Sequence, residues 1–301
     1  MAFTKRVVIG KKPVATKKPV AVSEGVLELP TMLSVPSDNL GDYSWLIYGT
    51  KKIGKTSLAG QFEDALFMMF EPGGKALSIY QVDCSSWEKA LGYLALLEKQ
   101  CKQGLLKYRT IVIDTGFEAF QKCFTFVCDK ENIEYPRMDN FGKDWRKIGN
   151  EFRSFHNRIA GLSVGLVVLC HEKLKESMTR TGNKFDMVTP NLSSVADDYY
   201  RATIDNVAWY HYRNRERFLL IKGSDYALAG TAVQSNKCFL TVAGEQIHAI
   251  PMGDSAEGGF NFIKRAFANK QKLTYREDTE KFLEESVKTS VHKKLRKGKN
   301  G

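Results

Sequence analysis

The stretch GTKKIGKT, from Gly49 to Thr56, constrains what this chain can fold into more than any other feature. Its two glycines let the backbone between them turn its N–H groups inward around phosphate oxygens. The lysine can reach the terminal phosphates of a nucleotide, and the threonine hydroxyl can ligate Mg²⁺. Such a loop needs a buried strand before it and a helix after it, and SWLIY and TSLAGQFEDA supply both. We therefore expect a nucleotide-binding loop.

The expected nucleotide-binding residues form one continuous run: Gly49, Thr50, Lys51, Lys52, Ile53, Gly54, Lys55, Thr56 and Ser57. Lys55 is also the expected catalytic cation, and Thr56 an expected metal ligand. Lys51 and Lys52 stand where small residues or proline are common in such loops. They either make the loop more attractive to anions and to nearby DNA, or they are simple surface variation.

From Tyr43 onward, short apolar strands alternate with longer helical segments, which predicts an α/β fold with a mainly parallel sheet. The segments are WLIY, SLAGQFEDA, ALFMMF, WEKALGYLALLEKQC, TIVID, FEAFQKCFTFVCD, WRKIGNEFRSFHNRIAGL and VGLVVLC. A polar stretch at 173–189 then predicts a β-hairpin or a mobile surface loop. Further on, NVAWYHYR, RFLLIKG and CFLTVAG predict antiparallel edge strands, and GFNFIKRAFA and 276–297 predict terminal helices.

Composition divides the chain into three parts: a flexible basic arm at 1–38, a catalytic domain at 39–250, and C-terminal helices with a basic tail at 251–301. With 45 lysines and arginines against 34 acidic residues, the net charge is +11, which favours an acidic partner such as nucleic acid. The tails either grasp phosphates or only aid solubility. The sequence has neither a long apolar run nor a secretory signal, so we expect no membrane association and a cytoplasmic protein.

Three further side chains follow apolar strands. Asp114 ends TIVID, where a carboxylate would complete a Mg²⁺ site. Glu71 follows ALFMMF and is either the catalytic base that activates water or a structural acid in the EPGG turn. His171 follows VGLVVLC and either senses the γ-phosphate or simply ends the strand.

Taken together, YGTKKIGKTS, MMFEPGG, TIVIDT and VVLCHEK resemble the RecA-like P-loop ATPases. More narrowly, they resemble the small phage-borne ATP-binding proteins known as Sak-type single-strand annealing recombinases. The resemblance covers about residues 40–240. It implies a RecA-like core with ATP and Mg²⁺ as cofactors. It also implies that Lys55 and Thr56 hold phosphate and metal, Asp114 completes the metal site, Glu71 activates water and His171 is the sensor.

The same resemblance implies a DNA-facing segment after the sensor. Its residues would be Lys173, Lys175, Arg180 and Lys184 for phosphates and Phe185 for base stacking, although Phe185 could equally be an ordinary hairpin residue. A neighbouring subunit would supply a cation, from Arg213, Arg217 or Lys222. The chain has no counterpart of a recombinase's N-terminal oligomerisation domain, so a ring, a filament and a monomer that assembles on DNA all remain open.

The sequence therefore predicts an Mg²⁺-dependent, DNA-stimulated ATPase that binds single-stranded DNA and promotes annealing in phage DNA metabolism. It would act in the host cytoplasm as a homo-oligomer, with or without a single-strand DNA-binding protein as a partner. The first alternative is an ATP-gated DNA-replication loader or accessory binding protein with little annealing activity. The second is a small-molecule kinase.

Overall fold

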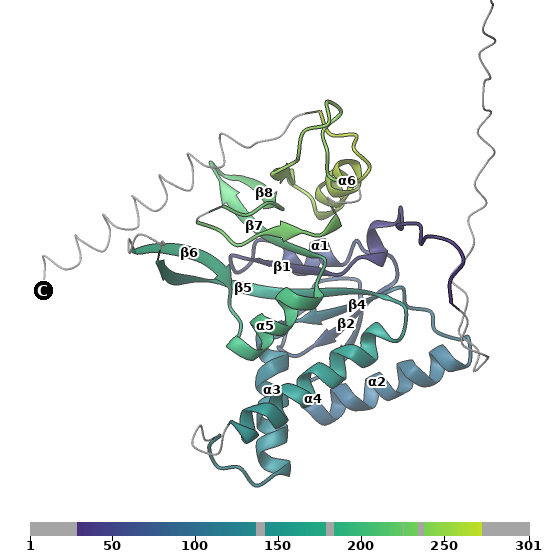
Figure 1. Cartoon of the computed structure of the whole chain (residues 1–301), viewed down its shortest axis with the longest axis vertical. Coiled ribbons are helices and arrows are strands. Elements are labelled where there is room, and N and C mark those ends of the chain that lie inside the picture. The colour runs from purple at the N-terminus through teal and green to yellow at the C-terminus, as the bar shows by residue number, and fades with distance from the viewer. Residues whose placement is uncertain (1–28, 137–141, 179–183, 225, 234–237, 273–301) are drawn as a thin grey trace, which may run out of the picture. The chain divides into compact units, whose positions relative to one another are not determined.

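A computed structural model describes residues 29–136, 142–178, 184–224, 226–233 and 238–272. Within these residues one sheet runs in the order β10-β8-β7-β1-β5-β4-β2-β3, with β6 paired to β5 and β9 to β7 (Figure 1). The chain from Ser37 onward is one unit, and residues before it belong to a separate segment. The predicted helix at 276–297 lies outside the described residues.

The sheet is parallel in its middle and antiparallel at one edge. The parallel strands are β1 (Trp45–Gly49), β2 (Ala65–Met69), β3 (Tyr80–Asp83), β4 (Thr110–Asp114), β5 (Gly165–Met178) and β7 (Asn206–Arg213). The antiparallel partners are β6 (Lys184–Pro190), β8 (Glu216–Leu220), β9 (Gly230–Thr231) and β10 (Ala249–Pro251). The predicted mainly parallel α/β fold with antiparallel edge strands is confirmed.

Helices cover both faces of the sheet. Alternate residues of each buried strand point to opposite sides, and both sets are apolar, so each face has to be covered. Leu46 and Tyr48 of β1 pack in the core that includes α2 (Trp87–Lys102), α3 (Gly116–Lys130), α4 (Lys143–Ala160) and α5 (Ser194–Thr203). Trp45 and Ile47 pack in the other core, with α1 (Lys55–Ala59) and α6 (Ala256–Phe267). A short 3-10 helix, η1 (Leu40–Asp42), precedes β1. The result is a three-layer α/β/α arrangement (Figure 1).

Two local predictions are wrong. The sequence predicts a helix over TSLAGQFEDA after the nucleotide loop, but α1 ends at Ala59 and Gly60 caps it. It also predicts a strand at CFLTVAG, which makes only isolated bridges, because Phe239 has a positive φ of 57° that extended strands do not use. None of the helices in the described part of the chain has the length and apolar character that a membrane span requires.

The strand order determines which loops meet. β5 lies between β1 and β4, and all three are parallel, so their carboxyl ends share one edge of the sheet. The nucleotide loop follows β1 and Asp114 ends β4, whereas His171 does not end its strand as predicted: it lies within β5, opposite Gly49 at the end of β1. Residues that are far apart in the sequence therefore come together at a single edge, which is where ligands bind in open α/β sheets.

Candidate nucleotide site

The backbone geometry of the loop after β1 requires both of its glycines. A Cβ atom on Gly49 would lie 1.9 Å from the carbonyl oxygen of Tyr210 on the adjacent β7. Gly54 has φ +106°, a conformation that L side chains rarely adopt. Between them, Ile53 is 1 % exposed and anchors the loop in the core, while Lys51 and Lys52 are exposed. The shape of the loop is thus fixed by the packing of Ile53 in the core and by the backbone conformations of the two glycines.

Lys55 is held inside this loop. Its Nζ atom donates hydrogen bonds to the carbonyl oxygens of Gly49, at 2.9 Å, and Thr50, at 2.8 Å. Burial lowers the pKa of Lys55, and the nearby carboxylates of Asp114 and Glu172 act in the opposite direction. A buried cation beside inward-turned backbone is the arrangement that receives the phosphates of a nucleotide.

Thr56 and Asp114, the two expected metal ligands, contact each other directly. The Thr56 hydroxyl donates to Oδ2 of Asp114 at 2.9 Å. Asp114 is buried, and that burial raises the pKa of its carboxyl group, while the Thr56 hydrogen bond lowers it. Mg²⁺ prefers oxygen ligands and takes one or two carboxylates together with substrate phosphates and water. This hydroxyl and carboxylate fit that requirement and would hold the ion.

Glu71 and His171 face each other at the same edge. Nε2 of His171 lies 3.6 Å from Oε1 of Glu71. The backbone N–H groups of Phe70 and Glu71 donate to the carbonyl oxygen of Asp114, at 2.8 and 3.4 Å, which holds the turn after β2 beside Asp114. The interaction with His171 lowers the pKa of Glu71, so this carboxylate is ionised at neutral pH, as a general base must be.

Glu172 was missed by the sequence reasoning. Its Oε1 accepts a hydrogen bond from the Thr50 hydroxyl at 3.0 Å, and its Oε2 accepts one from the indole Nε1 of Trp209 at 2.8 Å. Glu172 therefore joins the nucleotide loop, β5 and β7. No sequence signal could have found it, because both partners are distant along the chain and depend on the strand order.

Four of the five residues expected to face DNA lie on β5 and β6, whose antiparallel pairing confirms the predicted hairpin. Paired residues share a face of the hairpin. Lys173, Lys175 and Phe185 lie on one face, and Lys184 lies on the other, opposite Met178. Lys184 forms an ion pair with Glu176 at 2.6 Å, and Lys173 donates to the carbonyl oxygen of Leu192 at 2.6 Å. Arg180 lies outside the described residues.

The three cations considered for a neighbouring site differ in their surroundings. The guanidinium of Arg213 lies 5.6 Å from the Phe218 ring centroid, and Lys222 donates to Oε1 of Gln246 at 2.7 Å. Arg217 lies beside the chain's own nucleotide loop, with Nη1 at 3.7 Å from the position of a Cβ on Gly54.

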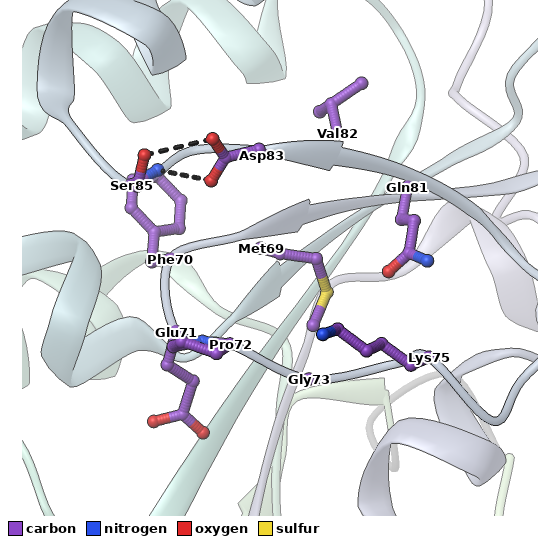
Figure 2. Close-up of a pocket in the computed structure, with 10 residues that line it drawn as sticks. All are labelled: Met69, Phe70, Glu71, Pro72, Gly73, Lys75, Gln81, Val82, Asp83 and Ser85. Atoms are coloured by element: carbon purple, nitrogen blue, oxygen red, sulfur yellow. Dashed lines mark hydrogen bonds between the residues drawn. The ribbon is translucent and has the colours of Figure 1, made fainter.

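A cavity of about 410 Å³ adjoins the site at the carboxyl ends of β2 and β3. It is lined by Met69, Phe70, Glu71, Pro72, Gly73, Lys75, Gln81, Val82, Asp83 and Ser85. Figure 2 shows the Glu71 carboxylate pointing away from Asp83 and Ser85, which hydrogen-bond to each other. The acidic group thus turns away from this part of the cavity wall and lies near His171 instead.

Among the known proteins that this chain is similar to are a curated protein and a solved structure. One is the SPbeta prophage-derived uncharacterized protein YorG of Bacillus subtilis (strain 168), 27 % identical over 177 residues. The match covers 54 % of each chain, so this chain spans about half the length of that relative. The other is the crystal structure of the KaiC-like protein PH0186 of Pyrococcus horikoshii OT3, with 14 % identity and a TM-score of 0.41 over 72 % of this chain and 88 % of that one.

A protein-family model matches a larger part of the chain than the YorG relative does. Residues 42–235 match the AAA domain family, a range that includes the nucleotide loop, Glu71, Asp114, His171 and the β5–β6 hairpin. Because the match covers more than half of the chain and contains the whole site described above, the chain belongs to the AAA domain family of P-loop ATPases.

Proposed function

We propose that this AAA-domain ATPase requires Mg²⁺, binds single-stranded DNA, is stimulated by it, and promotes annealing of complementary strands in phage DNA metabolism. The observation that carries the proposal is the path of β5. This one strand brings His171 to Glu71, places Glu172 against the nucleotide loop, and continues into the hairpin that bears Lys175 and Phe185.

Each site residue has a defined task in hydrolysis. Lys55 binds the terminal phosphates, and Thr56 and Asp114 hold Mg²⁺, which neutralises phosphate charge when bound. Glu71 orients the attacking water and accepts its proton, for which its lowered pKa keeps it ionised. His171, 3.6 Å from Glu71, is placed to respond to the loss of the γ-phosphate.

The hairpin supplies the chemistry for a single strand. Lys175 is exposed and shares a face with half-buried Phe185. A cation near an aromatic ring suits a nucleic acid strand, because the cation contacts phosphate and the ring stacks on a base. Glu172 and His171 connect this face to the nucleotide site, so a change from ATP to ADP would change the affinity for single-stranded DNA.

The prophage origin of the YorG relative supports the phage setting of the proposal. The net charge of +11 supports a polyanionic partner.

The test is an annealing assay with two complementary labelled oligonucleotides, run with Mg²⁺ and ATP, with ADP, and without nucleotide. We expect faster annealing with ATP than with ADP, and no ATP effect for Lys55→Ala. DNA binding without annealing would reject the annealing activity and favour the ATP-gated loader. No single-strand binding under any nucleotide condition would overturn the proposal as a whole.

A further inference from the structure

We propose that Arg217 is a phosphate-binding residue of the chain's own nucleotide site, rather than a cation supplied to a neighbouring subunit. The inference rests on the proposed nucleotide site and adds a second cation to it, from a strand at the far side of the sheet from Asp114. It assigns the chemical class of the ligand group: the phosphate chain of the nucleotide.

Arg217 reaches the loop because of where β8 begins. β8 runs antiparallel to β7, so its first residues lie at the same edge of the sheet as the carboxyl ends of β1 and β7. Arg217 pairs with Tyr212, and Leu219 pairs with Tyr210, which places these four side chains on the face covered by α1 and α6 (Figure 1). The guanidinium is thereby directed toward the loop and not toward the opposite layer of helices.

The guanidinium is fixed in place by its own chain. Its Nε donates to the carbonyl oxygen of Gly253, at 2.9 Å, in the turn between β10 and α6. The positive charge of Arg217 also lowers the pKa of Tyr210, against the larger raising effect of burial, which agrees with a guanidinium that lies near this side chain. Arginine carries five N–H donors in a planar fork, so donors remain for a phosphate after the bond to Gly253 is made.

The position of Arg217 next to Gly54 decides between the two roles. Nη1 lies 3.7 Å from where a Cβ of Gly54 would stand, so the guanidinium is adjacent to the chain's own nucleotide loop. A cation that completes a neighbour's site must project from the surface of its own subunit. Arg217 instead is half-buried and lies between its own nucleotide loop, Tyr210 and Gly253.

The first experiment measures equilibrium binding of a ribose-labelled fluorescent ATP, with ATP and inorganic triphosphate as competitors. We expect Arg217→Ala to weaken binding of both competitors about 10- to 100-fold, the loss of one or two hydrogen bonds to a charged group. The affinity of Arg217→Lys should lie between that of the unmodified chain and that of Arg217→Ala, because lysine keeps the positive charge but lacks the planar fork of donors. Arg265→Ala, an exposed arginine on α6, is the matched control and should bind like the unmodified chain.

The outcomes separate the possible failures. Unchanged ATP affinity for a folded Arg217→Ala or Arg217→Lys protein, with affinity lost in Lys55→Ala, overturns the role of Arg217 alone. Unchanged affinity in Lys55→Ala overturns the nucleotide site itself. A loss for ATP but not for inorganic triphosphate means that Arg217 reads the base or ribose, which also overturns the proposal.

The second experiment mixes Lys55→Ala with Arg217→Ala and measures ATP hydrolysis. If Arg217 acts within its own chain, every subunit in the mixture lacks a required group, and the rate equals the average of the two separate variants. If Arg217 serves a neighbour, some sites in the mixture regain both groups and the rate rises above that average. Such complementation would overturn the proposal.

Discussion

At the scale of single residues, burial and neighbouring groups shift the pKa values of the carboxyl groups in the site. Glu71 is partly exposed and lies 3.6 Å from His171, and its pKa is lowered. Asp114, one strand away and buried, has a raised pKa because it is desolvated. The pKa values of two carboxyl groups at one edge of the sheet are therefore shifted in opposite directions: Glu71 stays ionised on its own, whereas a nearby cation would favour the ionised form of Asp114.

Glu71→Gln removes the proposed base while keeping the shape of the side chain. We expect turnover to fall about 10²- to 10⁴-fold, the usual contribution of a positioned base. ATP affinity should remain within a small factor, because a glutamine side chain has nearly the same size and would still fit beside His171. Single-turnover hydrolysis and fluorescent-ATP binding measure the two quantities, with the exposed Glu88→Gln as a control. An unchanged turnover rate would remove Glu71 from the mechanism.

His156 predicts how stability depends on pH. It is fully buried, its Nδ1 donates to the Phe152 carbonyl oxygen at 2.8 Å, and its Nε2 lies 2.8 Å from the Tyr200 hydroxyl. Burial lowers its pKa from 6.5 to about 4. Between these values the unfolded chain binds a proton that the folded chain does not, so the folded state loses stability as pH falls and keeps its full stability above 6.5.

The expected slope from His156 is up to about 1.4 kcal/mol per pH unit. Urea unfolding at several pH values between 4 and 7 measures it, with His156→Gln as the comparison. Glutamine can still accept from Tyr200 but does not titrate, so the variant should have a shallower dependence on pH despite lower stability at neutral pH. Equal slopes for the two proteins would show that His156 does not carry this effect.

Sequence reasoning found the site residues that stand in a short, recognisable sequence pattern, and it missed those whose place in the site depends on long-range contacts. The glycines, Lys55 and Thr56 sit in one run, and Asp114, Glu71 and His171 each follow an apolar strand. Glu172 and the position of Arg217 depend on which strands are neighbours. That information is carried by the register of β1, β5, β7 and β8, not by any short motif.

At the scale of elements, β5 is the structure that links nucleotide to DNA in the proposal. It is 14 residues long, and its first half is buried in the sheet while its second half extends into the hairpin. The sequence predicted both halves, as an apolar strand and a polar hairpin, but not that they are one continuous strand. Continuity matters because a shift of His171 or Glu172 can be transmitted along it.

The two faces of the hairpin give a direct contrast. Lys175→Ala with Phe185→Ala should weaken single-strand binding and lower the slope of log affinity against log salt by about 0.7 for the lost phosphate contact. Lys184→Ala should have a smaller effect, because Lys184 lies on the opposite face and is paired with Glu176. Fluorescence anisotropy over a salt series measures both. A larger effect from Lys184→Ala would place the DNA on the other face or elsewhere.

Glu172 is expected to couple the loop to the hairpin. Glu172→Ala removes both hydrogen bonds, and Trp209→Phe removes only the bond to β7. We expect Glu172→Ala to lower the factor by which DNA stimulates hydrolysis more than it lowers basal hydrolysis, with Trp209→Phe intermediate. Hydrolysis rates at saturating ATP, with and without DNA, give the basal rate and the factor of stimulation. An equal loss of both rates would mean that Glu172 only holds the loop.

At the scale of the whole molecule, the fold class could be read from the alternation of strands and helices, but the strand order could not. β5 inserts between β1 and β4, although it follows both in the sequence. β3 was missed because it is an edge strand with mostly exposed residues and no apolar run. These features come from tertiary pairing, which local hydrophobic patterns do not encode.

The central claim is that this AAA-domain ATPase is coupled to single-stranded DNA. The measurement that tests it most directly is ATP hydrolysis by the purified protein with Mg²⁺, alone and with single-stranded or duplex DNA, beside a Lys55→Ala control. The account predicts hydrolysis that single strands stimulate more than duplex does and that the control lacks. Hydrolysis that is present in the unmodified chain, absent in the control and indifferent to any DNA would contradict it.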